Sequence, residues 1–141
     1  MASIHNDIRA ALEGKLAATS NLPTSIAYEN VPFEPTTGTS YLQTSYIPTS
    51  RRPSVRGLNP QQRYQGIFSV TVYAPEGNGP ATADAFANTI IEAFEATTDI
   101  PYTPSGGTTI NVSIDYAERQ QGFLDSPWYF IPIDIGWYTY K

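Results

Sequence analysis

Apolar and polar residues alternate most clearly in two segments of the chain. In residues 63–74 the apolar positions Phe68, Val70 and Val72 are separated by residues of a more polar kind. Residues 127–140 alternate in the same way, and one face is formed by Tyr129, Ile131, Ile133, Ile135 and Trp137. A period of two is typical of a strand with one buried face. The pattern therefore predicts strands at 63–74 and 127–140.

Three further segments have the composition of strands. Residues 26–30 and 40–47 are rich in β-branched and aromatic side chains, and residues 108–115 alternate Ile110, Val112 and Ile114 with polar neighbours. Such side chains fit the surface of a pleated sheet. We expect three strands here, joined by turns rich in proline and glycine.

Two segments show the period of an amphipathic helix. Ser3 is placed to cap a helix that ends before Pro23, with the apolar stripe Ile4, Ile8, Ala11, Leu12 and Leu16. The second helix is predicted at residues 81–97, with the stripe Ala83, Phe86, Ala87, Ile90 and Phe94. Both stripes are expected to pack on one sheet.

The predicted element order is α-β-β-β-α-β-β. Within 141 residues this order indicates a single α+β domain, residues 1–141, with an antiparallel or mixed sheet and two helices packed on it. The second face of the last strand is also aromatic, at Trp128, Phe130, Tyr138 and Tyr140. Because the helices cover one face, the other face is expected to need a partner. Pro132 suggests a bulge or a sheet edge within this strand.

Charge is distributed unevenly along the chain. The net charge is −5, yet four of the eight basic residues, Arg51, Arg52, Arg56 and Arg63, fall in the predicted loop 48–63, and no acidic residue lies between Pro35 and Pro75. The acidic total argues against nucleic-acid binding over a broad surface. The loop itself has three readings: a solvated connector, an arm that orders on contact with a neighbouring subunit or partner, or a direct contact with DNA.

Residues suited to catalysis or metal binding are sparse. There is no cysteine, and His5 is the single histidine, so neither a catalytic triad nor a zinc site can be assembled. We expect His5 to be exposed, and we expect no catalytic residues, metal or cofactor. The carboxylates are scattered, except that Asp134 lies in the last strand and is expected to be partly buried and paired, with an arginine from the loop or with a neighbour. The chain shows no signal peptide and no apolar run of membrane-spanning length, so we expect a soluble, cytoplasmically made protein.

Several segments resemble a known family in their order and spacing. They include the helix around residues 8–13, Tyr28–Phe33 (YENVPF), Arg63–Phe68 (RYQGIF) and the closing strand from Trp128 to Trp137. Together they resemble the small tail terminator, or tail completion, proteins of long-tailed bacteriophages. The resemblance covers nearly the whole chain.

The resemblance implies a structural role in the virion. Such proteins form a ring, typically a hexamer, at the head-proximal end of the tail tube, where they end tube polymerisation and join the tail to the head connector or stopper. It implies assembly in the host cytoplasm, DNA passing through the lumen without sequence-specific binding, no membrane, and no catalytic residues or cofactor. The alternatives are a head-side connector (neck) or tail tube subunit and, from another class, a small hydrolase or ligand-binding module. The candidate contacts to subunits or partners are Arg51, Arg52, Arg56, Arg63, Trp128, Phe130, Trp137 and Tyr138.

Overall fold

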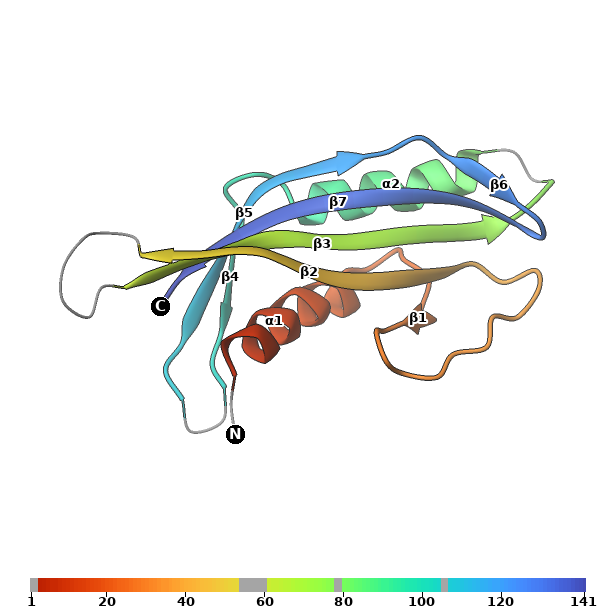
Figure 1. The fold of residues 1–141 in the computed structure, drawn as a ribbon. Helices are drawn as coiled ribbons and strands as arrows, with labels where there is room; N and C mark the ends of the chain where they lie inside the picture. Colours follow the sequence, from red (N-terminus) through yellow and green to blue (C-terminus); the bar gives the residue numbers. More distant parts are fainter. Residues whose placement is uncertain (1–2, 54–60, 78–79, 105–106) are drawn as a thin grey trace.

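The computed structural model describes residues 3–53, 61–77, 80–104 and 107–141 of the chain (Figure 1). It confirms an α+β fold in which two helices accompany one mixed sheet. The elements are α1 (Ile4–Ala18), β1 (Ile26–Ala27), β2 (Tyr41–Pro53), β3 (Gln62–Pro75), α2 (Ala81–Ala93), β4 (Asp99–Tyr102), β5 (Ile110–Arg119), β6 (Phe123–Asp125) and β7 (Trp128–Tyr140).

The sheet is built around the two strands that alternate most clearly in the sequence. Its order is β1-β2-β3-β7-β5-β4, and the short β6 pairs with β7. β1 runs parallel to β2, and every other described pairing is antiparallel. β3 and β7 pair along their whole length, from Arg63 opposite Tyr140 to Pro75 opposite Trp128.

Both helices pack on the same face of this sheet. α1 begins at the predicted cap, where the Oγ of Ser3 accepts a hydrogen bond from the backbone N–H of Asn6 at 3.2 Å. β4 and β5 curl around α1, while α2 lies along β3 and β7 (Figure 1). The buried core is one cluster of the helical stripes with the inward positions of the strands, among them Leu12, Phe68, Ile90 and Ile133.

The predicted arginine loop is shorter than expected, because strand pairing continues into it. β2 runs on to Pro53 and β3 starts at Gln62, so Arg51, Arg52 and Arg63 lie in strands rather than in a loop. The prolines are tolerated because a register shift follows Pro48 and because β1 covers β2 only at Leu42 and Gln43, which leaves the rest of β2 as a sheet edge. The paired ends of β2 and β3 form an arm at one end of the molecule (Figure 1).

Other boundaries also differ from the sequence expectation. α2 ends at Ala93 instead of residue 97, because the chain then joins the sheet through the backbone bond from Thr97 N to Ile114 O. The predicted loop after residue 100 contains β4, an edge strand that accommodates Pro101. The expected polar turn at 117–125 contains the end of β5 and all of β6. Pro132 lies in a central strand, yet its position falls between the ends of β5 and β6, where no ladder donor is needed.

Candidate functional site: the open face of the sheet

The face of the sheet opposite the helices, here called the open face, is uncovered along its centre in the described part of the chain. Register places its side chains in rows that cross β2, β3, β7 and β5. From the arm to the far end, the rows are Arg52–Arg63–Tyr140, Ser50–Gln65–Tyr138–Ser113, Ile47–Ile67–Gly136–Tyr116, Ser45–Ser69–Asp134–Glu118, Gln43–Thr71–Pro132 and Tyr41–Tyr73–Phe130. The first and last rows are ten residues apart along β3, which is about 33 Å.

The row farthest from the arm is the centre of an aromatic cluster. The rings of Tyr41 and Tyr73 stack with centroids 4.5 Å apart, and Trp128 meets Tyr41 edge-on at 5.1 Å. Phe130 follows Tyr73 at 5.5 Å, and Phe123 follows Phe130 at 5.6 Å. Burial in this cluster, followed by the nearby carboxylate of Asp125, raises the pKa of Tyr73.

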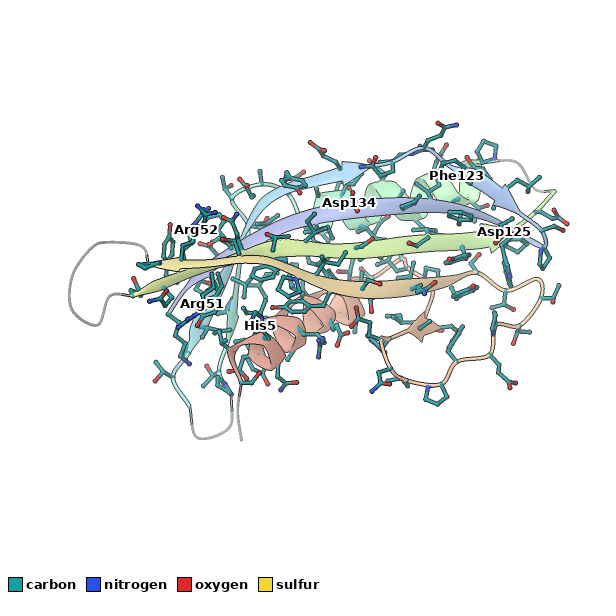
Figure 2. The ribbon with its side chains drawn as sticks, in the orientation of Figure 1. His5, Arg51, Arg52, Phe123, Asp125 and Asp134 are labelled. Carbon is teal, nitrogen blue, oxygen red and sulfur yellow. The ribbon has the colours of Figure 1, made fainter. Side chains whose placement is uncertain are left out.

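Two of the predicted contact residues lie in this cluster, and their side chains differ in exposure to solvent. Trp128 is 8% exposed and therefore mostly covered by its neighbours, whereas Phe130 is half-buried. Phe123 is 49% exposed and Leu124, its neighbour in β6, is 69% exposed. An apolar surface of this kind at the end of a sheet is typical of a contact site. Figure 2 shows Phe123 and Asp125 at the end of the molecule opposite Arg51 and Arg52.

The arm carries the predicted arginines on both faces. Arg52 and Arg63 lie directly opposite each other on the open face. The guanidinium of Arg63 lies 4.9 Å from the ring centre of Tyr138 and its Nη1 donates to the Oε1 of Gln65 at 2.6 Å. Arg51 lies on the helix side, where its Nε donates to the hydroxyl of Tyr64 at 3.0 Å. Arg56 lies outside the described residues. The structure thus places Arg63 opposite Arg52 and over the ring of Tyr138.

Trp137, one of the predicted contact residues, is buried in the folded chain and does not lie on the open face. Trp137 points to the helix side, is 1% exposed and stacks on Tyr46 with ring centroids 5.4 Å apart. It fills the space over Gly66, where an added Cβ would lie 2.7 Å from its Cζ2. The alternation of β7 places Trp137 among core residues, so its role is packing.

The structure also bears on two expectations about single polar residues. His5 is half-buried rather than exposed, and its Nδ1 lies 2.7 Å from the hydroxyl of Tyr46. Asp134 is half-buried as expected, but it accepts a hydrogen bond from Gln120 at 3.3 Å rather than pairing with an arginine. Arg63 lies opposite Tyr140, six residues away from Asp134 along β7, or about 20 Å.

Sequence reasoning missed several members of the open face. Tyr41, Tyr73 and Phe123 were not singled out because they join the cluster only through strand register. Glu118 falls in a segment expected to be a turn, yet it pairs opposite Asp134 at the end of β5. The alternation of residues 63–74 is the signal in the sequence that could have found Tyr73, because it places Tyr73 and Phe68 on opposite faces of the strand.

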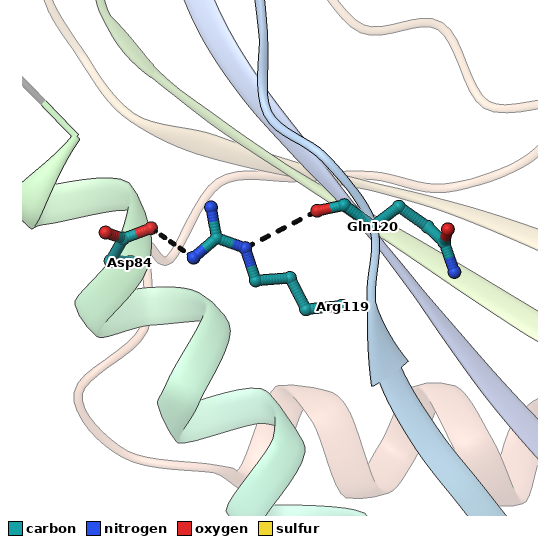
Figure 3. A network of polar contacts seen from close by, with 3 residues as sticks. All are labelled: Asp84, Arg119 and Gln120. Carbon is teal, nitrogen blue, oxygen red and sulfur yellow. Dashed lines mark hydrogen bonds and ion pairs between the residues drawn. The ribbon is translucent and has the colours of Figure 1, made fainter.

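No group of three or more His, Cys, Asp or Glu side chains among the described residues is placed to hold a metal ion. No helix in the part of the chain that the structure describes is long and apolar enough to span a membrane. An ion pair lies on the helix side, where the Nη1 of Arg119 in β5 lies 2.6 Å from the Oδ1 of Asp84 in α2 (Figure 3).

Comparisons with known proteins agree with this structure. No curated protein matches the chain. Twelve chains of solved structures match, and one of them, a protein named only by a sequence identifier, has a TM-score of 0.71 with 24% sequence identity over 99% of this chain and 97% of that chain; this shows a shared fold. The family model described as phage tail terminator protein matches residues 7–137. The chain therefore belongs to the phage tail terminator family, whose members are structural proteins of the bacteriophage tail.

Proposed function

We propose that this protein forms a closed ring, hexameric in its mature state, at the head-proximal end of the tail tube. The ring ends polymerisation of the tube, presents a surface to the head connector or stopper, and lets DNA pass through its lumen. The observation that carries the proposal is the open face, because a sheet with helices on only one side retains a second surface for a partner.

The chemistry of the open face suits contact between protein subunits. Aromatic side chains contribute large contact area at one end, while the rows between carry serine, threonine and glutamine together with Ile47, Ile67 and the acidic pair Glu118 and Asp134. The face is about 15 Å wide across four strands and about 33 Å long. Its area in projection is thus on the order of 500 Å², comparable with the roughly 800 Å² of accessible surface that each partner contributes to a standard interface.

The arm supplies a second, polar surface at the edge of the molecule. Arg51 and Arg52 lie at the end of β2 and Arg63 at the start of β3, and Figure 2 shows Arg51 and Arg52 at the end of the molecule opposite Phe123 and Asp125. Arginine forms directional hydrogen bonds with carboxylates and is common at interfaces. Together, the aromatic end and the cationic arm provide the two different surfaces that a head-to-tail ring requires.

Mass measurement and electron microscopy of the purified protein test this proposal. We expect a closed ring whose mass is a whole multiple of 15.5 kDa, and we expect tubes assembled from the tail tube protein to stop growing when the ring is added. A matched variant, Phe123→Ser with Leu124→Ser, removes the exposed apolar pair and should reduce capping of the tubes without unfolding the chain. An open polymer formed by this protein alone would instead identify a tube subunit. A single chain at high concentration that leaves tube growth unchanged would refute the proposal.

A further inference from the structure

The open face holds two pairs of like charges. In each pair, the two residues lie directly opposite each other on neighbouring strands. Arg52 in β2 is the direct partner of Arg63 in β3, and Glu118 in β5 is the direct partner of Asp134 in β7. Like charges directly opposite each other destabilise a sheet. Their presence at two places on one face therefore needs a reason that the isolated chain does not supply.

The arginine pair is not neutralised within the described residues. Arg63 donates to the neutral Gln65 and lies over the ring of Tyr138, and its buried Nε has no hydrogen-bond partner there. Arg52 is exposed. The ion pair that the structure shows among the described residues joins Arg119 to Asp84 on the helix side, away from the arginine pair. The two guanidinium groups thus retain donors for an external anion.

Among the residues that the structure describes, no cation pairs with Glu118 or Asp134. Glu118 is exposed, and Asp134 accepts a hydrogen bond from the amide of Gln120. On the same face, burial raises the pKa of the Tyr116 hydroxyl, and the carboxylates of Asp134, Glu118 and Asp115 raise this pKa further. This part of the open face is therefore negative.

The two pairs are unable to satisfy each other within one chain. Arg63 is six residues from Asp134 along the paired strands β3 and β7, a distance of about 20 Å. An arginine side chain does not reach that far. Two copies can, however, bring the arm of one chain to the acidic pair of another.

We propose that Arg52 and Arg63 of one copy bind Glu118 and Asp134 of the next copy, and that these contacts join the subunits of the assembly. The inference rests on the proposed ring. Guanidinium groups bind carboxylates through two parallel hydrogen bonds, which fixes orientation as well as charge. A second copy fits better than DNA, because the acidic pair on the same face repels phosphate.

Charge reversal in two halves of the contact tests the inference. One variant carries Arg52→Glu and Arg63→Glu, and the other carries Glu118→Arg and Asp134→Arg. Each alone should assemble with an apparent dissociation constant raised roughly tenfold or more, since each interface then joins like charges. An equal mixture should recover assembly, because alternating the two variants around a ring of even number restores an opposite-charge pair at every interface.

A variant that carries all four charge reversals in the same chain is the matched control for net charge, because its net charge stays at −5. It should assemble as the wild type does. A second control, Glu92→Arg with Glu95→Arg on the helix side, changes the net charge as much as the acidic variant and should leave assembly unchanged. Circular dichroism of each variant separates lost contacts from lost folding, and recovery in the mixture shows that both variants fold.

Three outcomes overturn the inference while leaving the proposed ring intact. The wild type forms a ring, but both reversed variants form it equally well. Alternatively, both variants fail and the mixture does not recover. Finally, arm reversal abolishes retention of a DNA duplex by the ring and leaves its mass unchanged, which assigns the arm to phosphate. In contrast, a wild type that remains a single chain and leaves tube growth unchanged refutes the proposed function itself.

Discussion

Gly66 and Gly136 occupy neighbouring strands, and the structure predicts different results for the same substitution. A Cβ on Gly66 would lie 2.7 Å from Cζ2 of Trp137 and 2.9 Å from Cα of Pro48, and nearer still to the carbonyl oxygen of Ile47. Two of these atoms belong to the backbone of β2. They are unable to move without disrupting the pairing of β2 with β3.

The expected cost follows from opposing effects. Forcing an extra methyl group into a packed site costs about 1–3 kcal/mol, and contact with backbone places Gly66→Ala at the upper end. Alanine also restricts the unfolded chain, which offsets about 0.5–1 kcal/mol. We therefore expect Gly66→Ala to lower the free energy of unfolding by about 2 kcal/mol, a large share of the 5–15 kcal/mol typical of a domain.

Gly136→Ala should cost less. The three atoms nearest to its Cβ belong to the ring of Tyr116, including Cδ1 at 2.6 Å and Cζ at 2.7 Å. This side chain lies on the open face and is able to rotate away, so we expect a loss of at most about 1 kcal/mol. Adding Tyr116→Ala removes the obstacle, and the double variant should show positive coupling in a double-mutant cycle.

Urea unfolding followed by tryptophan fluorescence measures these differences. All variants should be compared at one low protein concentration, because assembly makes apparent stability depend on concentration. Equal m-values would show that the unfolding transitions are comparable. The reasoning is refuted if Gly66→Ala costs no more than Gly136→Ala, or if Tyr116→Ala leaves the cost at Gly136 unchanged.

Three further predictions concern single side chains. Trp137→Ala should lower the free energy of unfolding by about 3–5 kcal/mol in urea titration, because it empties a buried site. Burial raises the pKa of Glu13 above its ordinary value of 4.5 more than the nearby Arg9 lowers it, so the folded chain holds this proton more tightly and loses stability as pH rises. Glu13→Gln should thus match the wild type below pH 4.5 and be more stable at pH 7 in thermal unfolding; an equal gap at both values would contradict this. Glu118→Gln should stabilise the single chain by about 0.2–1 kcal/mol by removing repulsion with Asp134, yet weaken assembly in mass measurements.

The periodicity of apolar residues predicted those elements that bury one continuous face. Both helices and the strands β3 and β7 follow that rule, and their stripes appear in the core cluster. The arm did not follow it, because Pro48 and Pro53 suggest a loop when read locally. Whether a proline interrupts a strand depends on whether the strand edge that lacks its N–H donor is paired with another strand. For β2, this depends on how far its brief contact with β1 extends. β4 and β6 are too short to show a period at all.

The candidate site was predicted in part for a related reason. Alternation in the last strand indicated a second aromatic face, and Phe130 and Tyr138 lie on it. Trp137 lies on the other face, which the same alternation assigns to the core. The charge pairs depend on register between strands distant in sequence, and register is not visible in one strand alone.

The two faces of the sheet separate the demands of folding from those of assembly. The core lies between the sheet and the helices, so its stabilisation does not depend on the open face. A repulsion of roughly 0.2–1 kcal/mol at each like-charge pair is small beside the 5–15 kcal/mol of a typical domain. The same repulsion limits how two copies approach, since arm against arm and acidic pair against acidic pair are both unfavourable. The remaining arrangement places the arm of one copy against the acidic pair of another copy, and this contact joins two different surfaces. Contacts of this type run head to tail, and they close into a ring when the rotation between copies divides the circle.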